Sequence, residues 1–153
     1  MTRTPPPATQ ARPAPARRAK FRQFRTLTTR WADNDVYGHM NNVVHYGLFD
    51  SAVNGWLIEQ GLLDLKASPE IGLVVETSCR YHGELAFPDL VTAGIGISRL
   101  GRSSVRYEIA LFRGDSDTAA AEGFFVHVYV DRQTRKPVAI GPKMRSKFEE
   151  MLL

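Results

Sequence analysis

A single helix-length apolar segment, residues 43–60, limits the possible folds of this chain more than any other feature. Its apolar residues recur at the spacing of one helix face: Val44, Leu48, Phe49, Ala52, Val53, Trp56 and Leu57. Asn41 or Asn42 is suited to cap the start of such a helix, and Gly61 to end it. Gly47 and Gly55 inside it each cost roughly 1 kcal/mol relative to alanine, which indicates close approach of another backbone. We therefore predict a helix covered by a sheet.

Short alternating runs separated by turns make up most of the remaining chain. One run, 24–31, precedes the helix, and four follow it, over 71–85, 90–100, 104–113 and 119–131. In the last run we expect Phe124, Val126, Val128 and Val130 to share the apolar face. A short terminal helix is predicted over 143–153. Because strands joined by tight turns pair antiparallel, we predict an α+β fold, a five-stranded antiparallel sheet wrapped around a long central helix. Such a sheet leaves an edge that a second copy would cover.

Polar side chains gather between the first run and the helix. Two carboxylates, an imidazole and two amides lie within ten residues, on Asp33, Asp35, His39, Asn41 and Asn42, and Asn34 lies among them. Free backbone N–H groups at a helix N-terminus point outward and favour negative charge. The sequence therefore predicts a reactive or binding site where the strand meets the helix.

The composition argues against several classes of protein. No apolar run approaches the ~20 residues of a membrane span, and no apolar segment near Met1 indicates secretion. The one cysteine, Cys79, has no disulfide partner, and no pair of histidines has metal-ligand spacing. We expect a cytoplasmic protein without membrane association, metal or other cofactor.

The charge is concentrated at the N-terminus. Residues 1–30 hold eight Lys or Arg and no acid, which leaves 12 basic and 16 acidic residues for the rest. Residues 1–20 also hold five of the nine prolines. We predict a disordered basic tail over residues 1–20 and one domain over 21–153. Since the domain is mildly acidic, we expect no nucleic-acid binding.

The order of residues in the polar segment is distinctive. Asp33 to Asn42 has the pattern D-x-D-x-x-G-H-x-N-N, and Phe49-Asp50 follows it. Together with the turn at 101–104 and the run 122–131, this pattern resembles a hotdog-fold acyl-CoA thioesterase of the 4-hydroxybenzoyl-CoA thioesterase-like group, over residues 22–150. The resemblance implies hydrolysis of acyl-CoA thioesters to free acid and coenzyme A. It also implies a homodimer or homotetramer with active sites between subunits.

The resemblance places the catalytic carboxylate at Asp35, which would act as a general base on water or as a nucleophile. The alternative is that Asp35 only braces its loop through backbone hydrogen bonds. Asp50, on the helix, is the reserve candidate for the base. We expect Asp33 to be structural and to pair with Arg30.

Gly38, His39 and Asn42 are the other candidate catalytic residues. Gly38 would let the backbone approach the thioester without a side chain in the way. His39 would donate to the carbonyl, orient Asp35 or simply form hydrogen bonds in the loop. Asn42 would position water or cap the helix. Backbone N–H groups from Gly38 to Asn42, at the positive end of the helix, would stabilise the oxyanion.

The candidate substrate-binding residues lie in three places along the chain. Tyr37 would line an acyl pocket or contribute to packing. His45 stands where related sequences often carry tyrosine, and Tyr46 is next to it, so it is open which of the two faces the substrate. The third place is a turn that contains Arg102, Ser103 and Ser104. It would bind the coenzyme A phosphates through guanidinium and hydroxyl groups, or it would simply be a solvated hairpin turn.

Two further hypotheses compete with hydrolysis. The first is a hydratase or dehydratase acting on acyl thioesters, since one fold hosts several chemistries. The second is a non-catalytic acyl-CoA or acyl-carrier binding protein. The G-H-M-N-N segment resembles the thioesterases better than the hydratases, and an intact Asp35 argues against a protein that only binds.

Overall fold

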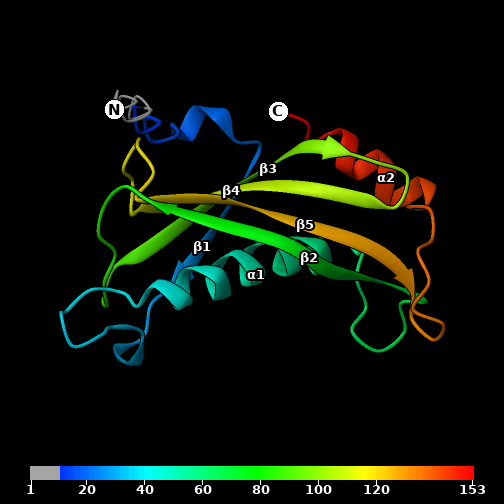
Figure 1. Ribbon diagram of the computed structural model, residues 1–153, viewed down its shortest axis with the longest axis horizontal. Coiled ribbons are helices and arrows are strands. Elements are labelled where there is room, and N and C mark those ends of the chain that lie inside the picture. The colour runs from blue at the N-terminus through cyan, green and yellow to red at the C-terminus, as the bar shows by residue number, and fades with distance from the viewer. Residues whose placement is uncertain (1–10) are drawn as a thin grey trace, which may run out of the picture.

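The computed structural model describes residues 11–153, which form a five-stranded antiparallel sheet with a long helix across one face (Figure 1). The strands are β1 (Gln23–Thr28), β2 (Glu70–Tyr81), β3 (Leu90–Leu100), β4 (Ser104–Arg113) and β5 (Ala121–Asp131), in the sheet order β1-β3-β4-β5-β2. The helices are α1 (Asn42–Glu59) and α2 (Pro142–Glu149), with 3-10 turns η1 (Arg18–Lys20) and η2 (Trp31–Asp33). The predicted α+β architecture is confirmed.

Helix α1 covers the sheet with most of the predicted face, although Val44 is only half-buried and His45 is buried in addition. The buried residues are His45, Leu48, Phe49, Ala52, Val53, Trp56 and Leu57. The side chain of Asn41 caps the start of α1 by accepting a hydrogen bond from the backbone N–H of Val43 at 3.1 Å. Gly61 follows the end of the helix with φ +66°, a conformation that glycine adopts without strain.

The close backbone approach expected at the glycines of α1 is wrong. A Cβ on Gly55 would meet the guanidinium of Arg25, which pairs with Glu59 across the helix end. A Cβ on Gly47 would meet no atom within 4 Å. A side chain from β1 therefore explains one glycine, and nothing in the structure explains the other.

Strands β3 and β4 supply the centre of the core beneath α1. On β4 the residues that alternate inward are buried, as predicted: Val105, Tyr107, Ile109 and Leu111. Ile95 and Ile97 of β3 are also fully buried. Helix α2 closes the end of this core, because Phe148 packs against Trp56 and Tyr107 with ring centroids 6.1 and 5.8 Å apart.

Of the four residues expected to share the apolar face of β5, only Val130 is buried. Phe125, His127 and Tyr129 are the residues buried toward α1, while Phe124, Val126 and Val128 are half-buried on the opposite face of the sheet. Both faces of β5 are apolar, so alternation alone could not choose between them. On the outer face the guanidinium of Arg106 lies 3.6 Å from the ring centroid of Phe124 and covers it.

Strand β2 lies at the edge of the sheet and exposes apolar residues. Its pairing with β5 shifts register between Val74 and Glu76, so the alternation of side chains changes in the middle of the strand. Leu73, Val74 and Val75 are 37%, 46% and 59% exposed. An edge of this kind can pair with another strand.

The N-terminal residues that the structure describes attach to the turn between β4 and β5. The backbone N–H of Arg18 donates to the carbonyl of Asp117, and that of Ala119 donates to the carbonyl of Ala16. The Arg18 guanidinium lies 4.7 Å from the ring centroid of Phe112. Ordered contacts thus begin at Ala16, before the expected domain start at residue 21, and residues 1–10 of the expected tail lie outside the described residues.

Candidate active site

The polar segment folds into a loop held by Asp33. This carboxylate is buried, and it accepts hydrogen bonds from the backbone N–H of Arg30 at 2.7 Å and from its Nη2 at 2.8 Å. The backbone carbonyl of Asp33 accepts from the N–H of Asn41, at the start of α1. The predicted pairing of Asp33 with Arg30 is confirmed, and it fixes both ends of the loop.

The loop is also attached to the connection between β2 and β3. The side-chain oxygen of Asn34 accepts from the backbone N–H of Phe87 at 2.9 Å. The backbone N–H of Met40 donates to the carbonyl of Leu85 at 2.7 Å. Residues 34–40 therefore form a loop that is held at both ends by hydrogen bonds to the connection between β2 and β3. Within that span Val36 is 93% exposed and Tyr37 is 81% exposed.

Asp35 uses one carboxylate oxygen to brace this loop. Its Oδ1 accepts from the backbone N–H of Tyr37 at 2.8 Å and from that of His39 at 3.4 Å. Its Oδ2 has no hydrogen-bond partner among residues 11–153. Asp35, together with Asn34 and Asn41, lines an open cleft of about 660 Å³. One carboxylate oxygen of Asp35 thus braces the loop, and the other has no hydrogen-bond partner among residues 11–153.

Few backbone donors of the loop are free to bind an oxyanion. The N–H groups of Gly38, Met40 and Asn41 donate to the carbonyls of Asp35, Leu85 and Asp33, respectively. Gly38 has φ +82°, a left-handed conformation that glycine adopts without strain. Among the expected donors, only the N–H of Asn42 has no partner within the described chain. It belongs to the first residue of α1, at the positive end of the helix dipole.

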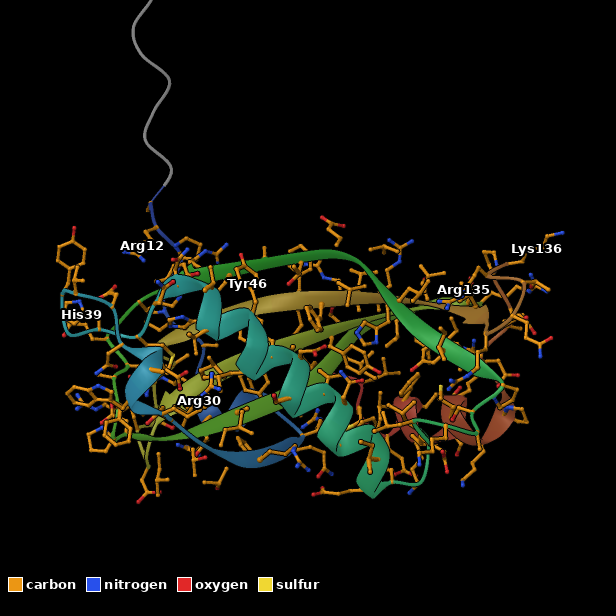
Figure 2. The ribbon with its side chains drawn as sticks, turned by 90° about the horizontal axis from the view of Figure 1, so that it is seen from below. Arg12, Arg30, His39, Tyr46, Arg135 and Lys136 are labelled. Carbon is orange, nitrogen blue, oxygen red and sulfur yellow. The ribbon has the colours of Figure 1, made fainter. Side chains whose placement is uncertain are left out.

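His39 faces an acidic residue that the sequence pattern did not identify. Its Nε2 lies 3.2 Å from Oε1 of Glu84, which follows the end of β2. The His39 side chain is 49% exposed. Figure 2 shows His39 in the loop beyond the first turn of α1, far from Arg135 and Lys136 at the other end of the molecule. Glu84 and Asn34 carry no local signal in the sequence, because their partners are distant along the chain.

The two aromatic positions at the start of α1 differ in their surroundings. His45 is buried, and its ring meets that of Tyr81 edge-on with centroids 4.8 Å apart. Burial is the main cause that lowers the pKa of His45. Tyr46 is half-buried and packs edge-on against Phe49. Neither residue lines the cleft beside Asp35.

The turn expected to bind coenzyme A lies far from Asp35 in the same chain. Arg102 and Ser103 connect β3 to β4, at the end of the sheet where α2 lies, whereas the polar loop lies at the other end (Figure 1). The carbonyl of Ser103 accepts from the backbone N–H of Tyr129 at 2.7 Å. Ser104 begins β4. One chain alone therefore does not bring this turn to the cleft.

No group of three or more His, Cys, Asp or Glu side chains within residues 11–153 is arranged to hold a metal ion. In the same residues no helix is long and apolar enough to cross a membrane. Burial raises the pKa of Cys79 to about 11, so its thiol is protonated at neutral pH.

Comparison with solved structures defines the class of protein. The PA5185 protein of Pseudomonas aeruginosa strain PAO1 is 46% identical, with 92% of this chain and 97% of that chain covered and a TM-score of 0.88. Slr0204, a 1,4-dihydroxy-2-naphthoyl-CoA thioesterase from Synechocystis, is 14% identical with a TM-score of 0.74, covering 82% and 93% of the two chains. BH1999 gentisyl-coenzyme A thioesterase is 21% identical with the same TM-score, covering 82% and 99%. The fold is the hotdog fold.

A family match then identifies the chain itself. The family model of the Thioesterase-like superfamily matches residues 29–148, from the polar loop to α2. The chain belongs to this superfamily. A search of curated proteins found no match.

Proposed function

We propose that this protein hydrolyses acyl-CoA thioesters to the free acid and coenzyme A, with Asp35 as the catalytic carboxylate. The main support for this proposal is the position of Asp35 and the hydrogen bonding of its two carboxylate oxygens. In a member of a thioesterase superfamily, this carboxylate borders an open cleft with one oxygen braced and the other unpartnered among the described residues. A carboxylate held in this way has a fixed orientation and retains a free lone pair.

The chemistry needs one base and one oxyanion donor. Asp35 Oδ2 takes a proton from water, and the resulting hydroxide attacks the thioester carbonyl carbon. The N–H of Asn42 stabilises the negative oxygen that forms. The C–S bond then breaks, and the thiolate of coenzyme A leaves and takes up the proton that Asp35 accepted. If Asp35 attacks the carbonyl directly, a mixed anhydride forms instead and water hydrolyses it in a second step.

We also propose that two copies assemble into a dimer through β2, with each active site completed by both. The support is the exposed apolar edge of β2 and the exposed apolar residues of the loop, such as Val36 and Tyr37. An antiparallel pair of β2 strands related by a two-fold axis brings the far end of one sheet to the polar loop of the other. In this arrangement the turn at Arg102 would lie at the same end of the paired sheets as the cleft of the partner subunit.

The activity is tested with a panel of acyl-CoAs, from short aliphatic to long-chain and aromatic acyl groups. Release of free thiol by the purified protein is followed alongside loss of the double bond from enoyl-CoA. We expect thiol release with at least one saturated acyl-CoA and no hydration of the enoyl substrate. Hydration without thiol release would replace the proposal with a hydratase, and binding without either reaction would replace it with a carrier.

A further inference from the structure

A second pocket lies where α1 ends, at the opposite end of the molecule from Asp35. Its volume is about 230 Å³, and its walls come from the residues after α1, the start of β2, β5 and the segment leading into α2: Leu62, Glu70, Tyr129, Ala139, Ile140 and Met144. An apolar cavity of about 150 Å³ binds benzene, so this pocket has room for about six to nine carbon atoms.

Tyr129 gives this mostly apolar pocket a polar wall. The residue is 4% exposed, and burial raises the pKa of its hydroxyl to about 12. The Tyr107 hydroxyl lies beside it, and the pKa of Tyr107 is raised well above its ordinary value by burial and by Tyr129. Both hydroxyls therefore stay protonated and uncharged at any physiological pH.

His127 stands behind the same wall without a hydrogen-bond partner. Its Nδ1 and Tyr129 Cζ both lie against Gly72, since a Cβ there would be 3.0 Å from the first and 3.4 Å from the second. Both ring nitrogens of His127 are buried with no partner among residues 11–153. Burial lowers the pKa of His127 to about 4, so the ring is neutral.

The Tyr107 hydroxyl and Trp56 Nε1 are likewise buried without a hydrogen-bond partner among residues 11–153. Three other buried polar side chains do have a hydrogen-bonding contact: Thr29 with the carbonyl of Asp89, Asp33 with Arg30, and His45 with the carbonyl of Asn41. A buried polar group without a partner costs free energy, which an apolar residue of similar size would avoid. Polar groups gathered behind one wall of a pocket favour a ligand with a hydrogen-bonding group. The side chains of Tyr107, His127 and Tyr129 are neutral. The two charged residues of the lining, Glu70 and Lys143, are exposed at the surface, so the group bound inside the pocket is uncharged.

The dimer proposed above brings this pocket to a catalytic loop. Within one chain, the 18 residues of α1 separate the pocket from Asp35, a distance of about 27 Å at 1.5 Å per residue. Two β2 strands paired about their centre place Glu70 of one chain next to Tyr81 of the partner subunit. In each chain the hydroxyl of Tyr81 donates to the carbonyl of Asn42 at 3.2 Å, so the start of α1 and the polar loop before it lie next to Tyr81.

We propose that the pocket around Tyr129 binds the acyl end of the thioester that is hydrolysed at Asp35 of the other subunit. The preferred acyl group is about six to nine carbon atoms long and ends in an uncharged hydrogen-bonding group such as a hydroxyl. This assignment rests on the proposed hydrolysis of acyl-CoA and names its substrate class. Tyr129 is the residue that sets the preference, and Tyr107 and His127 support it from behind.

The first test compares octanoyl-CoA with 8-hydroxyoctanoyl-CoA. We expect the wild type to prefer the hydroxylated substrate by about 10-fold or more in kcat/KM, the effect of one buried hydrogen bond. Tyr129→Phe should remove this preference, and a circular-dichroism spectrum and a melting curve like those of the wild type show that the variant is folded. An equal preference in wild type and Tyr129→Phe would overturn the assignment.

The second test asks which chain supplies each part of the site. Asp35→Asn and Ala139→Trp, which fills the pocket, should each be inactive on 8-hydroxyoctanoyl-CoA. When both are co-expressed, a mixed dimer has one site with an intact Asp35 and an intact pocket, so about a quarter of the wild-type activity should return with random pairing. Activity in Ala139→Trp alone, or no recovery in the mixture, would overturn the shared site.

These results separate the inference from the function on which it rests. If the wild type hydrolyses octanoyl-CoA and Asp35→Asn does not, the proposed function stands whatever Tyr129→Phe does. If the wild type hydrolyses no thioester, both proposals fall.

Discussion

Two carboxylates in the polar loop are two residues apart and have different surroundings. Asp33 is buried and spends both oxygens on Arg30, whereas Asp35 is half-exposed and keeps Oδ2 free of partners within residues 11–153. Asp33 therefore fixes the loop, and we propose that Asp35 takes part in the hydrolysis. The pairing of Asp33 with Arg30 could be predicted because the two residues are close in sequence.

Asp33→Asn tests the fixing role. Loss of the charge weakens hydrogen bonds to a buried carboxylate, so we expect a decrease of about 2–3 kcal/mol in the free energy of unfolding, measured by urea titration. Asp117→Asn is the matched control, because the ion pair of Asp117 with Arg17 is largely exposed. Its effect should be below about 0.5 kcal/mol. If the two substitutions decreased the free energy of unfolding equally, Asp33 would not be the residue that holds the loop.

His127 makes the stability of the fold depend on pH. Burial lowers its pKa to about 4 from the ordinary value of 6.5, so the unfolded chain binds a proton between these values and the folded chain does not. The free energy of unfolding should therefore be highest above pH 6.5 and decrease by up to about 3 kcal/mol as the pH falls toward 4. Buried His45, whose pKa is also lowered, adds to the same trend.

Urea titrations between pH 4 and 8 check this dependence. His127→Phe should retain the fold and show a shallower slope, since it no longer takes up a proton on unfolding. A slope identical to that of the wild type would mean that other groups cause the acid sensitivity. The position of His127 inside the core was not predicted, because β5 is apolar on both faces and alternation alone does not show which face is the inner one.

At the scale of the elements, contact between α1 and β5 depends on one glycine. A Cβ on Gly123 would clash with the carbonyl oxygen of Ser78 on β2 and would lie 2.9 Å from the Phe49 ring on α1. Strand and helix therefore pack at a distance that only glycine permits. The sequence predicted the glycines within α1 as the close contacts, but the close contact lies on the sheet side.

Gly123→Ala and Gly47→Ala form a matched pair for this contact. The first should decrease the free energy of unfolding by about 1–3 kcal/mol, because backbone of β2 would have to move. The second should increase it by up to about 1 kcal/mol, because a Cβ at Gly47 meets open space in a helix. Thermal and urea unfolding of both variants measure the difference. A Gly123→Ala variant as stable as the wild type, or more stable, would contradict this packing.

For the whole molecule, the proposed dimer accounts for features that one chain leaves without an explanation. Leu73, Val74 and Val75 are exposed on the β2 edge, and the turn at Arg102 lies at the wrong end of the sheet for its own cleft. Element order and approximate strand ends could be predicted from local patterns. In the proposed dimer, the position of this turn relative to Asp35 of the partner subunit depends on how two chains assemble. A local sequence pattern carries no information on that assembly.

Val75→Lys tests assembly through β2. A charge on this edge should prevent pairing, so we expect a monomer in sedimentation velocity and loss of thioesterase activity. Thr26→Lys is the control on the other edge strand, where Thr26 of β1 is exposed, and it should leave both mass and activity unchanged. A fully active monomer of Val75→Lys would rule out a site shared between subunits.

The most direct measurement for the central claim is kcat/KM for the best acyl-CoA in wild type, Asp35→Asn and Asp50→Asn. The two variants make the same chemical change, one in the cleft and one on the exposed side of α1, where Asp50 bonds to Asn54. Loss of the base predicts a decrease of about 10²-fold or more for Asp35→Asn, and little change for Asp50→Asn. Retained activity in Asp35→Asn together with its loss in Asp50→Asn would move the catalytic carboxylate onto the helix and contradict the assignment.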